Sequence, residues 1–178
     1  MVIDEPALVL TATRLGRRLA ELQGLVATVE SCTGGLIARL LTETAGSSAW
    51  FDRGFVTYSN ESKVDLVGVR ISSLAEHGAV SEVVAGQMAV GGLKHSQAVM
   101  ALAVTGIAGP GGAVAGKPVG TVCFGWALAL PQAGRRDQVV VETCHFDGDR
   151  AAIRLQTAHH ALTRGLALLD TWAEGIGG

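Results

Sequence analysis

The chain has 178 residues, of which 48% are hydrophobic and 17% are charged, with 14 basic and 16 acidic side chains. This length and composition exclude a disordered tail and favour a single domain over residues 1–178 with a substantial buried core. A net charge of −2 without a basic run argues against a nucleic-acid partner. The apolar runs are shorter than the roughly 20 residues that a membrane span needs.

Targeting and metal-binding patterns are missing from the sequence. Asp4, Glu5 and Pro6 interrupt the region where an export leader would continue, so a cytoplasmic protein is expected. The three cysteines are widely spaced and the five histidines are scattered, without a Cys-x-x-Cys or His-x-x-x-His pattern. We therefore expect reduced thiols, no metal site and no cofactor.

The first part of the chain alternates helical and strand-like patterns. Leucines at helical spacing, a β-branched run and turn residues such as Gly24 and Gly46 set the expected boundaries. Asn60 can cap the helix that follows it. In chain order, we expect a helix over 6–24, a strand over 25–30, a helix over 34–46, a strand over 54–59 and a helix over 61–68.

The second part of the chain adds a short helical turn and then a longer helix that starts at Ser81. A buried apolar strand follows and ends in a glycine-rich loop. Two further strands, 119–130 and 137–146, are joined by the polar turn 131–137 and form an antiparallel hairpin in the simplest interpretation. The last helix spans 147–175 and is started by Asp147 or Asp149.

This order of elements predicts an α/β fold. A single three-layer domain is expected, with a mixed and mostly buried sheet that carries helices on both faces. Folds of this kind bind ligands in the loops at the carboxyl ends of their strands.

The loop "ESCTGG", residues 30–35, joins the first strand to the second helix. Its backbone N–H groups at a helix start could stabilise an anion or an oxyanion, and Gly34 and Gly35 would let a ligand approach the backbone. Alternatively, Ser31 or Thr33 only caps the helix.

A second loop, "TGIAGPGGAVAGKPVG", runs from Thr105 to Gly120. It matches neither a phosphate-binding Walker loop nor a dinucleotide fingerprint. Because it follows a buried strand, its backbone donors could face the same crevice as Ser31, although a glycine-rich tract can also be a plain connection.

A third segment, "GFVTYSNESK", gathers polar residues at a strand-to-helix turn. Tyr58 and Lys63 could converge on one ligand there, with Asn60 beside them. The alternative is a capped helix with a solvated lysine, as at most lysine positions.

Several of these motifs resemble one known family. The segments "ESCTGGLIARLLTETAGSSAWFDRGFVTYSNESKVDLVGV", "HGAVSE", "ALAVTGIAGPGG" and "GKPVGTV", with a later "GDR", resemble the C-terminal domain of the CinA proteins, which also occurs as a stand-alone nicotinamide-nucleotide amidohydrolase. The resemblance covers about residues 8–169. It implies hydrolysis of the carboxamide of nicotinamide mononucleotide, giving nicotinic acid mononucleotide and ammonia, in pyridine-nucleotide salvage and without a metal.

The resemblance also implies roles for individual residues. The resemblance makes Ser31 the nucleophile and gives Lys63 and Tyr58 assisting roles. On chemical grounds we hypothesise that Lys63 is the neutral amine that acts as the base, and that Tyr58 relays the proton or helps ammonia to leave. N–H groups near Thr33 to Gly35 would hold the oxyanion. The residues expected to bind substrate are Thr33, Gly34, Gly35, Asn60, Thr105, Gly106, Gly109, Gly111 and Arg150. An arginine at a helix start is unfavourable to the helix dipole, so Arg150 indicates either a bound anion nearby or merely a bond to Asp147.

Other interpretations stay open at this point. Cys32 could be the nucleophile, since a thiol near a helix start gains thiolate character, although a small buried residue is the simpler interpretation. The domain could also bind a nucleotide without hydrolysing it, or take part in a competence-linked interaction. We expect a homo-oligomer, most simply a dimer.

Overall fold

The computed structural model describes residues 4–129 and 137–176, and it confirms the α/β class. The polar turn expected over 131–137 falls almost entirely outside the described residues. In chain order the elements are α1 (Glu5–Glu21), β1 (Val26–Glu30), α2 (Leu36–Thr42), the short 3-10 helix η1 (Ser47–Ala49), β2 (Phe51–Val56), α3 (Asn60–Val67), α4 (Ile71–His77), α5 (Glu82–Lys94), β3 (Met100–Gly106), β4 (Thr121–Leu128), β5 (Gln138–His145) and α6 (Arg150–Ile176).

One five-stranded sheet with the order β2-β1-β3-β4-β5 forms the middle layer. β1 pairs in parallel with β2 and β3, whereas β4 runs antiparallel to both β3 and β5, so the expected hairpin is confirmed. Between Val26 and Ala27 the register to β2 shifts, because Val26 lies opposite Phe51 and Ala27 opposite Arg53. Asp52 is thus an extra residue in β2, as in a β-bulge.

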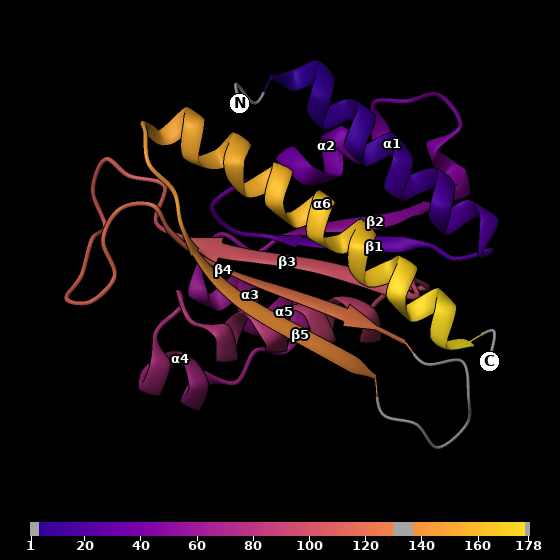
Figure 1. Ribbon diagram of the computed structural model, residues 1–178. Coiled ribbons are helices and arrows are strands. Elements are labelled where there is room, and N and C mark those ends of the chain that lie inside the picture. The colour runs from indigo at the N-terminus through magenta and orange to yellow at the C-terminus, as the bar shows by residue number, and fades with distance from the viewer. Residues whose placement is uncertain (1–3, 130–136, 177–178) are drawn as a thin grey trace.

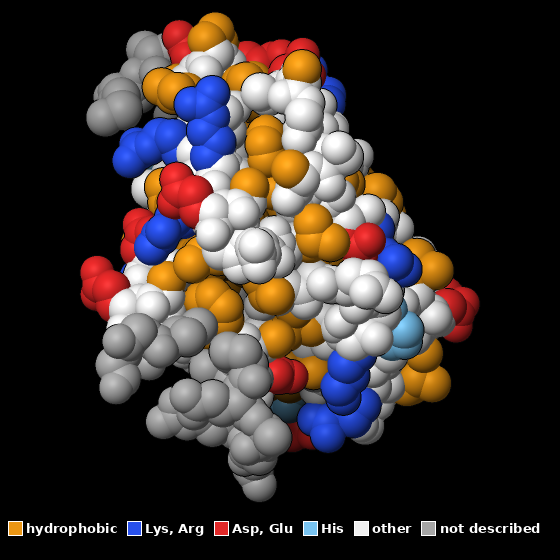
Figure 2. Space-filling view, turned by 90° about the vertical axis from the view of Figure 1, so that its right-hand side faces the viewer, with side chains coloured by type: hydrophobic (Ala, Val, Ile, Leu, Met, Phe, Trp, Pro, Cys, Tyr) orange, Lys and Arg blue, Asp and Glu red, His pale blue; other side chains and the backbone are white. Residues whose placement is uncertain are grey.

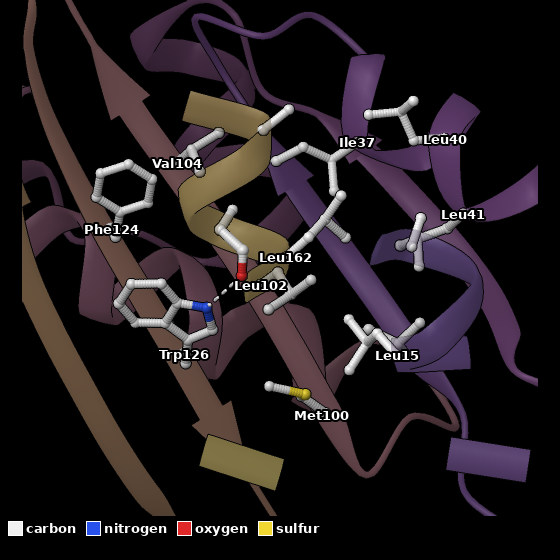
Figure 3. Packing of buried hydrophobic residues seen from close by; sticks show 14 of the residues in the cluster. Leu15, Ile37, Leu40, Leu41, Met100, Leu102, Val104, Phe124, Trp126 and Leu162 are labelled. Carbon is white, nitrogen blue, oxygen red and sulfur yellow. Dashed lines mark hydrogen bonds between the residues drawn. The ribbon is translucent and has the colours of Figure 1, made fainter. Parts of the chain in front are cut away.

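Helices cover both faces of the sheet, as expected (Figure 1). The helices α1, α2 and α6 lie on one face, where leucines and aromatic side chains form the larger core. Within this core Phe124 and Trp126 stack, with ring centroids 5.5 Å apart, and the indole N–H of Trp126 donates to the Ala161 carbonyl at 3.1 Å (Figure 3). Each large side chain buried in this way contributes about 1.5–3 kcal/mol.

The opposite face is covered by α5, with α3 and α4 beside it. Here the strands present small residues such as Ala101 and Ala103, and α5 approaches closely. A Cβ on Gly91 of α5 would stand 1.9 Å from the Val67 carbonyl oxygen of α3. Glycine at this position therefore lets α3 pack directly against α5.

Several expected boundaries were wrong. β2 spans Phe51–Val56 rather than 54–59, and α2 ends at Thr42. Asn60 is the first residue of α3 and not its cap, because the Ser59 hydroxyl accepts from the Ser62 N–H at 3.1 Å while the Ser62 hydroxyl bonds back.

Two expected helix starts are confirmed. The Ser81 hydroxyl accepts the N–H of Val84, at 3.3 Å, at the start of α5. Of the two candidates for α6, Asp149 is the residue that accepts a first-turn N–H, from Ala152 at 2.9 Å.

The described surface carries its hydrophobic side chains among charged ones. On the side seen in Figure 2, orange patches alternate with Lys, Arg, Asp and Glu side chains. Within residues 4–129 and 137–176, none of the helices combines the length and the apolar character that crossing a bilayer requires.

Candidate active site

The turn that carries Ser31 follows β1, between the carboxyl ends of β2 and β3. The Ser31 N–H donates to the Val104 carbonyl of β3 at 3.0 Å, and the Ser31 carbonyl accepts from the Gly34 N–H at 3.1 Å. Gly34 and Gly35 have φ angles of 60° and 94°, in the left-handed region that glycine tolerates best. The glycines thus turn the chain sharply between the strand and α2.

The amides of Gly34 and Gly35 do not face a ligand. Gly34 N–H bonds to Ser31, and Gly35 N–H donates to the Glu30 carboxylate at 3.0 Å. The expectation that these two amides hold an oxyanion is therefore wrong. In this turn, the N–H groups of Cys32 and Thr33 are the ones that have no hydrogen-bond partner among the described residues.

Lys63 is buried beside Ser31, with 1% of its surface exposed. It lies in the second turn of α3, and its Nζ is 3.2 Å from Ser31 Oγ. Nζ also donates to the carbonyls of Thr57 at 2.8 Å and Ser59 at 3.4 Å. Burial lowers the pKa of the Lys63 side chain below its ordinary value, against the opposing charge of Glu61. A neutral amine can donate two N–H groups to carbonyls and keep its lone pair for the Ser31 hydroxyl.

Tyr58 and Arg150 meet at the rim of the site. Arg150 donates to the Tyr58 hydroxyl at 3.0 Å and to the Gly109 carbonyl at 2.8 Å. Its described partners do not include Asp147, which had been one explanation for this arginine. The Tyr58 side chain is 60% exposed, and only its backbone carbonyl, 3.5 Å from Nζ, contacts Lys63.

These residues surround a cavity of about 230 Å³. Larger hollows of about 780 and 490 Å³ lie elsewhere on the described surface, but neither contains Ser31 or Lys63. The smaller cavity is the one next to reactive side chains. It is lined by Ser31, Cys32, Tyr58, Asn60, Lys63, Ala79, Val80, Thr105, Gly106, Ala108 and Arg150.

Most of the residues proposed from the sequence line this cavity, but five do not. None of the five belongs to the lining: Thr33 and Gly109 are buried, Gly35 is half-buried, and Gly34 and Gly111 are exposed. Sequence reasoning missed Ala79 and Val80, which belong to the "HGAVSE" motif. Thr105 is fixed against this segment, since its hydroxyl donates to the Ala79 carbonyl at 2.9 Å.

Cys32 has the wrong environment for a thiolate nucleophile. Its side chain is only 6% exposed, and burial raises the pKa of the thiol to about 12. A thiol with this pKa stays protonated at neutral pH and reacts poorly. Ser31, which has a basic partner within hydrogen-bonding distance, is the better nucleophile.

Metal-binding groups are missing from the part of the chain that the structure describes: residues 4–129 and 137–176 contain no cluster of three His, Cys, Asp or Glu side chains that could hold a metal ion. The functional groups that line the cavity include the Ser31 hydroxyl, the Cys32 thiol, the Tyr58 phenol, the Lys63 amine and the Arg150 guanidinium.

Fold and site together define a single α/β domain with a buried serine–lysine pair at the carboxyl end of a parallel strand. The chain belongs to the CinA C-terminal domain family, whose model matches residues 10–169. It is 50% identical to the nicotinamide-nucleotide amidohydrolase PncC of Escherichia coli K12, over 84% of this chain and 87% of that protein. To the protein of the same name from Pseudomonas putida it is 46% identical, with 90% and 95% covered.

Solved structures agree with this assignment. The crystal structure of the competence/damage inducible protein CihA from Agrobacterium tumefaciens superimposes with a TM-score of 0.84 at 46% identity, covering 92% of this chain and 95% of that one. The resemblance expected from the sequence motifs is thereby confirmed.

Proposed function

We propose that this protein is a nicotinamide-nucleotide amidohydrolase that converts nicotinamide mononucleotide to nicotinic acid mononucleotide and ammonia. The relatives named for this activity align over most of their length, which supports the proposal. The observation that carries it is the 3.2 Å separation of Lys63 Nζ and Ser31 Oγ inside a cavity. A serine hydroxyl attacks an amide only when a nearby base takes its proton.

The first half of the reaction forms an acyl-enzyme. Nζ of Lys63 takes the Ser31 proton as Oγ bonds to the carboxamide carbon, and the carbonyl electron pair moves to oxygen. The free N–H groups of Cys32 and Thr33 hold this oxyanion. The Lys63 ammonium then protonates the amide nitrogen, the C–N bond breaks, and ammonia leaves.

The second half releases the acid. A water molecule attacks the ester carbon while Nζ takes one of its protons, and the Ser31 oxygen leaves with that proton. The sum is amide plus water to carboxylic acid plus ammonia. The enzyme returns to its starting protonation state without a metal or cofactor.

Binding of the substrate is assigned to the rim of the cavity. Arg150 has a guanidinium suited to a phosphate, and the Tyr58 hydroxyl and Gly109 carbonyl hold it in place. Asn60, Thr105 and Gly106 line the remaining wall. A proton-relay role for the Tyr58 hydroxyl is not supported by a hydrogen bond to Ser31 or Lys63 among the described residues.

The test is ammonia release from nicotinamide mononucleotide by the purified protein, with and without a chelator. We expect turnover that the chelator does not change, loss of turnover in Ser31→Ala, and retained turnover in Cys32→Ala. If only the cysteine variant is inactive, Cys32 is the nucleophile.

A folded protein that binds the nucleotide without releasing ammonia would be a binding module, which is the second candidate function.

Two further properties, the oligomeric state and the location, stay predictions. The homodimer is tested by sedimentation velocity, and the cytoplasmic location by cell fractionation.

A further inference from the structure

We propose that Glu30 is a positioning residue for the reaction: its buried carboxylate holds the turn after β1 so that the Ser31 hydroxyl stays at the cavity with the amides of Cys32 and Thr33 next to it. This inference rests on the proposed function and extends it to a residue outside the cavity. Glu30 is 1% exposed and is not part of the cavity lining.

The carboxylate of Glu30 is fully engaged by the turn and the first part of α2. Its Oε2 accepts from the Thr33 hydroxyl at 2.7 Å and from the N–H groups of Gly35 and Ile37, both at 3.0 Å. Its Oε1 accepts from the N–H of Ala38 at 2.8 Å. One side chain therefore ties the residue before Ser31 to the helix that follows the turn.

This arrangement replaces an ordinary helix cap. The cap position of α2 is occupied by Gly35, which has no side chain to accept the first N–H groups. Helices usually receive this bond from a Ser, Thr, Asp or Asn at the cap itself. Here a carboxylate from the end of the preceding strand takes that place, where its negative charge also suits the helix dipole.

Thr33 is held from both sides as a result. Its hydroxyl donates to Glu30, while its carbonyl accepts from Nη2 of Arg154 at 2.6 Å. With the side chain and the carbonyl fixed, the peptide groups that precede Thr33 are fixed too. These peptides carry the two N–H groups without partners in the described turn, which are the oxyanion donors of the proposed reaction.

Glu30 does not act on Lys63 directly. Among the described residues no ion pair joins them, and the carboxylate whose charge opposes the effect of burial on the Lys63 pKa is that of Glu61. Glu30 should therefore affect the geometry of the Ser31 turn but not the protonation of the base. This difference separates positioning from an electrostatic role.

The test is the variant Glu30→Gln, which keeps the shape of the side chain but turns one acceptor oxygen into a donor that faces N–H groups. We expect kcat to fall by about 10- to 100-fold, short of the roughly 100- to 1,000-fold loss typical of removing an oxyanion donor. KM should change by less than about threefold, and the acid limb of the pH profile should not move. Labelling of Ser31 by a fluorophosphonate should slow by a similar factor.

The matched control is Asp4→Asn. Asp4 is another acidic helix cap, accepting from Ala7 at 3.0 Å at the start of α1, and it is exposed. This variant should keep wild-type kcat. If Glu30→Gln lowers the thermal midpoint but keeps wild-type kcat and labelling, Glu30 is only a cap and the proposal is wrong.

Two further outcomes are separable. If Glu30→Gln does not fold, Thr33→Val removes one of the four bonds and should still lower kcat and labelling by about 3- to 10-fold; an unchanged rate overturns the proposal. If the wild-type protein releases no ammonia, the proposed function fails, and the labelling comparison still decides the role of Glu30.

Discussion

The substitution Lys63→Met tests the central contact of the site. It keeps a long side chain in the buried position and removes only the amine that lies 3.2 Å from Ser31 Oγ. A positioned general base typically contributes about 100- to 10,000-fold. We therefore expect kcat to fall within this range, which corresponds to about 2.7–5.4 kcal/mol of transition-state stabilisation.

The effect on folding should be small in comparison. Met leaves the buried Thr57 carbonyl without the N–H that it now accepts at 2.8 Å, which costs about 1–3 kcal/mol. Against this, the substitution removes the desolvation of a buried amine. Circular dichroism and a thermal melt should show a folded protein at the assay temperature, and Lys94→Met, at an exposed lysine, should keep full activity.

The assay is ammonia release by the wild-type protein, both single variants and the double variant Ser31→Ala/Lys63→Met. Residues that act as one unit are not additive, so the double variant should be no less active than Ser31→Ala alone, within about threefold. The reasoning is refuted if Lys63→Met keeps more than about a tenth of the wild-type kcat, or if the two losses multiply.

Three other predictions follow from the geometry. Activity should rise with pH as the Lys63 ammonium loses its proton, at a pH below the ordinary lysine pKa. The variant Glu61→Gln removes a negative charge that raises the Lys63 pKa, so the acid limb of the pH profile should move to lower pH. This shift should be larger at low salt. Arg150→Met should raise KM for nicotinamide mononucleotide about tenfold or more in steady-state assays, with kcat changed far less. Gly91→Ala forces a methyl group against the Val67 carbonyl and should lower the free energy of unfolding in urea by about 1–3 kcal/mol or more, whereas Gly111→Ala, with no atom within 4 Å, should not.

The sequence was sufficient for the class of fold and for bringing Ser31 and Lys63 together. Ser31 follows a strand with a clear, fully buried β-branched run, and the motifs that contain Ser31 and Lys63 both resemble those of one family. The order of the strands came only from the structure, because pairing depends on contacts between segments far apart in the chain.

Local chemistry could not decide between near-equal alternatives. Ser59 and Asn60 are both good helix caps, and the reciprocal bond of Ser62 selects Ser59. The boundary of β2 was set too late because Trp50 and Phe51 follow a cluster of turn residues. Neither error could be removed by propensity alone.

The features of the site that sequence reasoning missed are side-chain hydrogen bonds between residues that are distant in the sequence. Glu30 was interpreted as the last residue of a strand, but its side chain bonds N–H groups up to eight positions further on. Arg150 was proposed from the sequence, but its partners, 41 and 92 positions away along the chain, were not. Such contacts exist only after the layers have packed.

The extra residue in β2 acts as a spacer for the site. Ser31 follows β1, and Lys63 lies on the helix after β2. The distance between the two side chains therefore depends on where the carboxyl end of β2 lies relative to the carboxyl end of β1. Removing Asp52 would shorten the path by one strand residue, about 3.3 Å. Either Trp50 would be pulled from its buried place beside Leu41, or the end of β2 would withdraw and take the amine with it. An insertion or deletion in this half-exposed edge strand should therefore move Lys63 away from Ser31 and lower the activity.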